Sequence, residues 1–165
     1  MPDVYVALGS NVEPEQHLEL ALEALEAAFG PLTLSGVYRN AAVGFEGDDY
    51  LNLVVGFSST GSAPAIVEQL DIIESRCGRK RDEARFAPRT LDLDLLMYGD
   101  DIVDETDHRL PRPEILEYSF VLKPLADIAG ERRHPVNGQT IAELWAEFDH
   151  DQHPLTPVPW PVSGR

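Results

Sequence analysis

The sequence has very little cysteine and no long hydrophobic run. Cys77 is the only cysteine among 165 residues, so no intrachain disulfide can form, and a reducing compartment is favoured. No apolar stretch approaches the roughly 18 residues that a bilayer span requires. The first residues, Met1 to Val6, lack the basic start of a signal peptide. These absences argue against a disulfide-stapled secreted domain or a membrane protein and predict a cytoplasmic location.

Basic residues are also scarce. The chain has 13 Lys and Arg against 29 Asp and Glu, which gives a formal net charge of -16. This acidity argues against binding to nucleic acid or to an anionic membrane. The segment from residue 76 to residue 89 is an exception, because it contains Arg76, Arg79, Lys80, Arg81, Arg85 and Arg89. A cationic segment in an acidic protein suggests a small anionic ligand; the alternative is a solvated loop whose charges balance nearby acids.

Several catalytic signatures are missing from the sequence. It contains no G-x-x-x-x-G-K-[ST] phosphate loop, no G-x-S-x-G, no HExxH and no CxxC. Walker-type nucleotide binding, serine hydrolysis, zinc proteolysis and thiol redox chemistry therefore lose support.

The apolar pattern predicts one compact domain of the α+β class. Strands are expected over residues 4–8, 32–38, 50–58 and 91–98, and helices over 14–29 and 62–77. The order strand, helix, strand, strand, helix, strand is that of a ferredoxin-like fold. We expect an antiparallel sheet with helices on one face and the substrate site on the other, where Tyr50 and Asn52 point.

The remainder of the chain is less regular. We expect a short edge strand at 101–103, helical turns over 120–128, and a last helix that starts at the capping box of Thr140 and Glu143. Residues 1–149 would form the domain, and the proline-rich residues 150–165 an irregular tail. The histidines of this part are expected on the solvated surface: His134, His150 and His153.

The segment from Arg89 to Leu96 carries the most informative chemistry. In a strand, Asp92 and Asp94 share one face, with their Cα atoms about 6–7 Å apart. Magnesium usually binds through one or two carboxylates together with substrate phosphates. The alternative is an exposed strand face with solvated acids. The neighbouring arginines favour the metal, because diphosphate transfer needs carboxylates for magnesium beside guanidinium groups for phosphate.

The motifs together resemble those of a known family. They are Val6-Ala7-Leu8-Gly9-Ser10-Asn11, Tyr50-Leu51-Asn52, Ile73-Glu74, Gly78-Arg79, Pro88-Arg89-Thr90-Leu91-Asp92-Leu93-Asp94 and Phe120-Val121-Leu122-Lys123-Pro124-Leu125. In this order they resemble 6-hydroxymethyl-7,8-dihydropterin pyrophosphokinase over about residues 4–148. The P-R-T-L-D-L-D string is the most specific of them. The resemblance implies transfer of diphosphate from ATP to a reduced hydroxymethylpterin in folate synthesis, with AMP as the other product.

The resemblance also implies a role for each matching residue. Asp92 and Asp94 would bind two magnesium ions, and Arg79 and Arg89 would stabilise the migrating diphosphate. The residues implied in ATP binding are Glu74, Arg81, Arg85 and Arg112. Those implied in pterin binding are Asn40, Val43, Tyr50, Asn52 and Phe120, with Phe120 stacked on the ring. Small-molecule substrates and a monomer are expected.

Asn40 stands in place of a common threonine, a minor change, and four further positions depart from the usual pattern of this family. Phe86 stands in place of a common tryptophan, Arg112 in place of a histidine, Tyr118 in place of a phosphate-binding arginine, and Asp82 in place of a basic residue. These changes concern the nucleotide contacts more than the metal site. Two alternatives therefore stay open: a divergent paralogue acting on another pterin-like alcohol, and a non-catalytic pterin-binding module.

Overall fold

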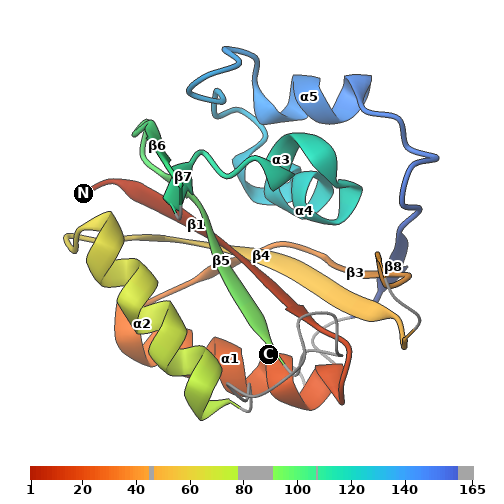
Figure 1. Cartoon of the computed structure of the whole chain (residues 1–165), viewed down its shortest axis with the longest axis horizontal. Coiled ribbons are helices and arrows are strands. Elements are labelled where there is room, and N and C mark those ends of the chain that lie inside the picture. The colour runs from red at the N-terminus through yellow and green to blue at the C-terminus, as the bar shows by residue number, and fades with distance from the viewer. Residues whose placement is uncertain (45–46, 78–90, 107, 160–165) are drawn as a thin grey trace.

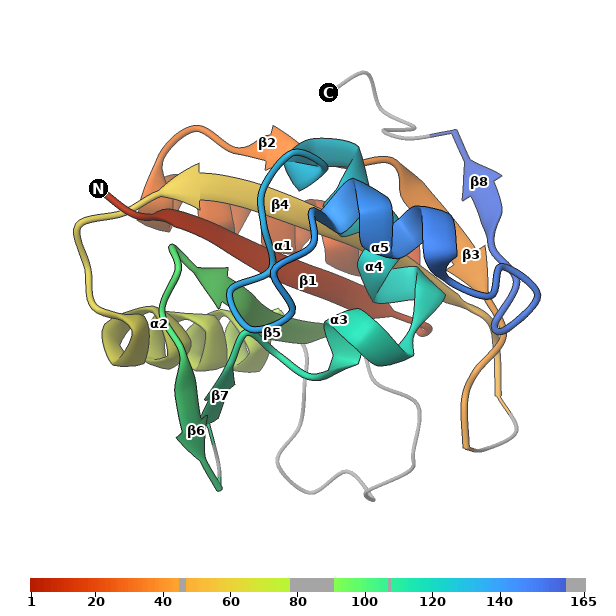
Figure 2. The same ribbon diagram turned by 90° about the horizontal axis from the view of Figure 1, so that it is seen from above.

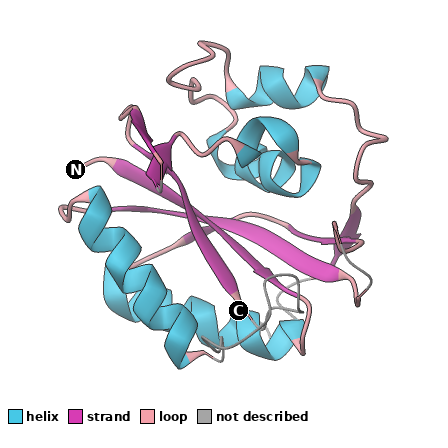
Figure 3. Cartoon of the chain, in the orientation of Figure 1, coloured by secondary structure: helices cyan, strands magenta, loops and turns pink. Residues whose placement is uncertain are grey.

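The computed structural model describes residues 1–44, 47–77, 91–106 and 108–159, which form a sheet with helices on both of its faces (Figures 1 and 3). The strands are β1 (Asp3–Ser10), β2 (Thr33–Leu34), β3 (Val37–Asn40), β4 (Tyr50–Ser58), β5 (Asp92–Tyr98), β6 (Val103–Glu105), β7 (His108–Leu110) and β8 (Thr156–Val158). The helices are α1 (Pro14–Phe29), α2 (Ala63–Arg76), α3 (Glu114–Glu117), α4 (Ser119–Ala129) and α5 (Ile141–Glu147).

The main sheet has six strands in the order β5-β1-β4-β3-β8, and β2 pairs with β4. All of these pairings are antiparallel. Without β2 and β8, this is the strand order of the ferredoxin-like fold, so the α+β prediction is confirmed. Because β1 and β5 lie side by side, the A-L-G-S-N and D-L-D strings are neighbours, with Gly9 opposite Asp92.

Helices α1 and α2 cover one face of the sheet (Figures 1 and 2). Their apolar stripes recur every three to four residues, as a helix packed on a sheet requires. The main core lies between these helices and the strands, and it contains the expected alternating side chains of β4: Leu51, Leu53, Val55 and Phe57.

Helices α4 and α5 lie on the opposite face, which the sequence analysis leaves open for ligands. Val54, Leu96 and Met97 point to this side and form a second apolar cluster with Leu122, Leu125 and Ile141 of the two helices, among others. A ligand-accessible part of this face remains beside the start of α4. Helix α5 has the predicted capping box, because Glu143 N donates to Thr140 Oγ1 and Thr140 N donates to Glu143 Oε1, each at 3.1 Å.

Two strands differ from their predicted bounds. The expected strand over 32–38 is divided into β2 and β3, because the Oγ of Ser35 takes the place of a backbone carbonyl and accepts from Val54 N at 2.8 Å. The expected edge strand at 101–103 is instead β6, which pairs with β7 in a separate hairpin. The opposed Asp104 and Arg109 form an ion pair at 3.5 Å across it.

The last part of the chain also differs from expectation. Within the segment expected to be irregular, β8 pairs with β3 at the sheet edge. His134 is buried, at 4% exposure, whereas the sequence analysis expects it on the surface. Its Nδ1 accepts backbone N–H groups of Val136 and Asn137, which explains how a polar ring is accommodated there. No helix within the described ranges is long and apolar enough to cross a membrane.

Candidate active site

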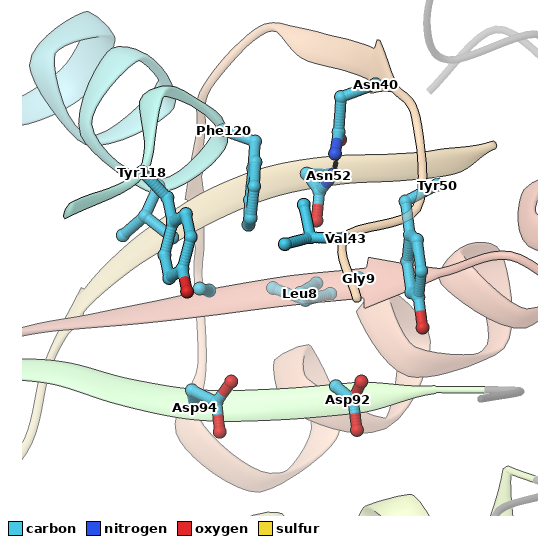
Figure 4. Close-up of a pocket in the computed structure, with 12 residues that line it drawn as sticks. Leu8, Gly9, Asn40, Val43, Tyr50, Asn52, Asp92, Asp94, Tyr118 and Phe120 are labelled. Atoms are coloured by element: carbon cyan, nitrogen blue, oxygen red, sulfur yellow. Dashed lines mark hydrogen bonds between the residues drawn. The ribbon is translucent and has the colours of Figure 1, made fainter. Parts of the chain in front are cut away.

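A cavity of about 260 Å³ opens on the second face of the sheet, between the ends of β1, β4 and β5 and the start of α4 (Figure 4). Every pterin-binding residue implied by the resemblance lines it, together with both candidate metal ligands. The lining residues are Ala7, Leu8, Gly9, Asn40, Val43, Tyr50, Asn52, Asp92, Asp94, Tyr118, Phe120 and Val121. The structure thus brings together residues of β1, of β3 and the loop after it, of β4, of β5 and of the start of α4.

The two aspartates lie on one side of this cavity, on β5 (Figure 4). The strand alternates as predicted, because Leu93 is buried in the core while Asp92 and Asp94 are partly exposed on the other face. Two carboxylates on one strand face fit the oxygen ligands that magnesium prefers, with its remaining positions left for phosphate and water. The donor set therefore fits a magnesium site.

Glu74 supports this strand from the other side. Its side chain is buried, at 6% exposure, and its Oε2 accepts the backbone N–H of Leu93 at 2.7 Å. Among the described strands β5 lies at the edge of the sheet, so this N–H meets the Glu74 carboxylate where a central strand would meet a neighbouring strand. Glu74 therefore fixes the backbone between the two aspartates. Its role in ATP binding stays a prediction.

A pair of amides forms the upper wall of the cavity in Figure 4. Asn52 Nδ2 donates to Asn40 Oδ1, and Asn40 Nδ2 donates to Ala41 O at 3.0 Å. Both side chains are buried, at 9% and 5% exposure. With its Nδ2 engaged, Asn52 presents its Oδ1 to the cavity as a hydrogen-bond acceptor (Figure 4).

Gly9 makes this arrangement possible. A Cβ at this position would lie 2.8 Å from Asn52 Oδ1, closer than atoms can pack. The glycine of the A-L-G-S-N string is thus explained sterically, because the Asn52 side chain lies directly over the β1 backbone at Gly9.

Aromatic rings bound the cavity at its two ends. Figure 4 shows Tyr50 on one side and Phe120 on the other, with Val43 and the amide pair between them. Tyr118 stacks on Phe120, with ring centroids 4.9 Å apart and planes 19° from parallel. The space between Tyr50 and Phe120, hereafter the ring slot, suits a flat heterocycle.

Arg112 connects the aspartates to a second cavity. Its backbone N–H donates to Leu96 O at 2.9 Å, which holds it beside β5, and its guanidinium lies 3.5 Å from Asp94 Oδ1. It also forms an ion pair with Glu114. The second cavity, again of about 260 Å³, is lined by Thr106, His108, Arg109, Arg112, Pro113 and Glu114. Of the residues implied in ATP binding, Arg112 is thus next to the candidate metal site.

The other predicted phosphate-binding residues fall outside the described part of the chain. They are Arg79, Arg81, Arg85 and Arg89, and the departures Asp82 and Phe86 belong to the same segment, 78–90. Their assigned roles stay predictions, as do the roles of the residues that the cavity brings together.

The cavity also contains residues to which the sequence analysis gives no function. Tyr118 appears there only as a departure from the family pattern, yet it lines the cavity and supports Phe120. The only sequence signal for the position of Tyr118 is that it lies two residues before Phe120. Gly9 carries a clearer signal, because a glycine within a strand marks a close approach.

Fold and cavity together define an α+β domain in which a slot for a flat ring adjoins a carboxylate pair. Residues 5–130 match the sequence model of the family "7,8-dihydro-6-hydroxymethylpterin-pyrophosphokinase". The chain belongs to this family.

Curated relatives bear the same description. The chain is 36% identical to the 2-amino-4-hydroxy-6-hydroxymethyldihydropteridine pyrophosphokinase of Synechocystis, over 96% of this chain and 79% of the relative. It is 35% identical to that of Haemophilus influenzae, over 95% of this chain and 100% of the relative. A folic acid synthesis protein of Pneumocystis carinii is 33% identical over 93% of this chain, which spans only 21% of that longer protein.

Solved structures show the same fold. The HPPK-DHPS protein of Plasmodium falciparum superposes with a TM-score of 0.73 over 88% of this chain and 44% of that one. The sequence identity is 14%, so this likeness establishes the fold alone.

Proposed function

We propose that this protein transfers diphosphate from magnesium-bound ATP to 6-hydroxymethyl-7,8-dihydropterin, giving AMP and the pterin diphosphate, a step of folate synthesis. Membership of the pyrophosphokinase family supports the reaction. The observation that carries the assignment is the placement of the ring slot directly beside Asp92 and Asp94 in one cavity.

The ring slot accounts for recognition of the pterin. Tyr50 and Phe120 would lie against the two faces of the ring, and Asn52 Oδ1 would accept a hydrogen bond from an N–H group at its edge. Val43 would close the slot from the loop after β3. The hydroxymethyl group would then extend towards β5 and the aspartates.

In the reaction, the pterin hydroxyl oxygen forms a bond to the β-phosphorus of ATP. The bond between that phosphorus and the oxygen bridging to the α-phosphorus breaks, and AMP leaves with the bridging oxygen. Bound magnesium would neutralise phosphate charge and ease loss of the hydroxyl proton, which passes to water. Asp92 and Asp94 would hold this metal, and the rigid slot would hold the hydroxyl in line with the phosphorus.

The nucleotide is proposed to lie on the Arg112 side of the aspartates. Arg112 adjoins Asp94, and the cavity around it includes Arg109 and His108, all possible donors to phosphate or nucleotide oxygens. Arg79 and Arg89 are proposed to stabilise the migrating diphosphate, with Arg81, Arg85 and Glu74 on the ATP side. Two magnesium ions, a monomer and a cytoplasmic location complete the proposal; the last rests on the single cysteine.

The test is to measure AMP formed from Mg-ATP with and without the reduced hydroxymethylpterin. Pterin-dependent AMP without ADP is the expected result, because the two terminal phosphates move as one unit. Pterin binding without AMP would contradict the proposal. It would instead favour the non-catalytic module or the paralogue, which a set of related alcohols would then distinguish.

A further inference from the structure

The C-terminal segment, residues 149–158, returns to the ring slot. After α5 the chain passes the start of α4 and then pairs as β8 with β3, with Thr156 opposite Arg39 and Val158 opposite Val37 (Figure 2). Asn40, at the end of β3, lines the slot. The segment therefore joins two walls of the slot, the β3 edge and the start of α4.

His153 is the residue through which this segment contacts the aromatic wall. Its backbone oxygen accepts a hydrogen bond from the Oγ of Ser119, a side chain only 1% exposed. Its ring lies 5.3 Å from the ring of Tyr118, at 58°, and 6.0 Å from the ring of Phe120, in an edge-on arrangement at 74°. Tyr118, Phe120 and His153 thus form a cluster of three rings, hereafter the ring cluster.

Within the ring cluster, Phe120 is held from two directions. Tyr118 stacks on Phe120 at a centroid distance of 4.9 Å, while His153 meets it edge-on. Stacked and edge-on pairs are both favourable, and together they restrict rotation of the Phe120 ring about its side-chain bonds. A stacking surface of fixed orientation binds a flat ligand more tightly, because less side-chain freedom is lost on binding.

The backbone of His153 is itself unusual. Its φ of 56° lies in the left-handed region, which a residue with a Cβ rarely adopts. Such a conformation persists where surrounding contacts determine it, here the Ser119 hydrogen bond and the ring cluster. This unusual backbone conformation of His153 lies where the C-terminal segment contacts the aromatic wall of the ring slot.

We propose that His153 is a positioning residue for the pterin: it fixes the orientation of Phe120 and thereby sets the affinity of the ring slot. The inference rests on the proposed function, because it assumes that a pterin occupies the slot. It extends that function to a segment beyond residues 5–130, the range that the family model matches.

The test compares three variants of the full chain. His153→Ala removes the ring and His153→Phe restores a ring. Both variants carry the same Cβ, so their comparison isolates the effect of the ring from that of the left-handed backbone. The matched control is His150→Ala, since His150 lies in the same segment but stacks on Trp145 of α5, at 4.1 Å, and contacts no member of the ring cluster in the described part of the chain. The KM values for pterin and for ATP, kcat and the melting temperature are measured for each.

For His153→Ala we expect a pterin KM raised about 3- to 10-fold, the range that corresponds to loss of aromatic pair contacts. The ATP KM and kcat should stay near those of the wild type, and the lost ring contacts should lower the melting temperature by only a few degrees, at roughly 2–4 °C per kcal/mol. His153→Phe should recover most of the pterin KM, and His150→Ala should not change it.

An unchanged pterin KM in His153→Ala would overturn the inference. So would a parallel rise in both KM values with a lower melting temperature, which would indicate a purely structural role. A wild-type protein that neither binds nor uses the pterin would instead refute the proposed function, and this inference with it.

Discussion

The contact between Gly9 and Asn52 yields a quantitative prediction for pterin affinity. In Gly9→Ala the new Cβ would lie 2.8 Å from Asn52 Oδ1, about 0.6 Å short of the 3.4 Å at which ordinary contact begins. Asn52 is buried and bonded to Asn40, so its side chain cannot simply turn into solvent. A shift of this size exceeds the roughly 0.5 Å range of hydrogen-bond lengths, so the bond from Asn52 to the pterin is lost.

Loss of this hydrogen bond costs about 1–2 kcal/mol, which corresponds to roughly 5- to 30-fold weaker pterin binding. The assay is calorimetric titration of the reduced pterin in the presence of magnesium and an unreactive ATP analogue. The affinity for the analogue alone should not change, because Gly9 and Asn52 lie away from Arg112 and its cavity.

Gly56→Ala is the matched control. It also adds a Cβ to a strand on the second face of the sheet, where it would lie 3.0 Å from Tyr5 Cε1, outside the ring slot. Both variants are expected to lower the melting temperature by roughly 2–4 °C for each kcal/mol of overpacking. Equal pterin affinity in Gly9→Ala and Gly56→Ala would refute the assigned role of Asn52.

Three further predictions concern the metal site, its support and a buried histidine. Asp94→Asn should lower magnesium-dependent kcat by more than about 100-fold while pterin binding persists in titration; near-normal turnover would contradict the metal assignment. Glu74→Ala should lower the free energy of unfolding, measured with denaturant, by about 1–3 kcal/mol, because the N–H of Leu93 loses its acceptor. Glu74→Gln retains an acceptor and should lose less; equal losses in the two variants would disprove this role. Burial lowers the pKa of His134 from its ordinary 6.5, so the unfolded state binds more protons than the folded state near this pH. The free energy of unfolding should therefore fall as the pH decreases from 7 through 6.5 towards the folded-state pKa. His134→Asn keeps a hydrogen-bond acceptor and should weaken this pH dependence, as measured by thermal melts.

The fold follows from local patterns to a large extent. The stripes of α1 and α2 are strong because each helix buries a single face, and the larger apolar side chains of β4 alternate towards the main core. The antiparallel order is that of the predicted topology. Helices α4 and α5 cover part of the second face, which local patterns do not indicate. Their placement depends on long-range packing with Val54 and Met97, which no local period reveals.

The positions of site residues could be predicted from the sequence where these residues lie within motifs, and less well elsewhere. The D-L-D spacing alone puts both carboxylates on one face, and the structure places them there. The position of Glu74 behind β5 could not be inferred, because it depends on which backbone N–H groups face outward at the sheet edge. Likewise, β8 and the contact of His153 with Phe120 arise from a proline-rich segment whose local pattern indicates no strand.

A crystal structure of the complex with the reduced pterin, magnesium and an ATP analogue carrying a methylene bridge between the α- and β-phosphorus would test the central claim most directly. The account predicts the pterin ring between Tyr50 and Phe120, with an edge N–H on Asn52 Oδ1. It also predicts metal ions on Asp92 and Asp94, facing the hydroxymethyl oxygen. A pterin bound elsewhere, or metal held without these two carboxylates, would contradict it.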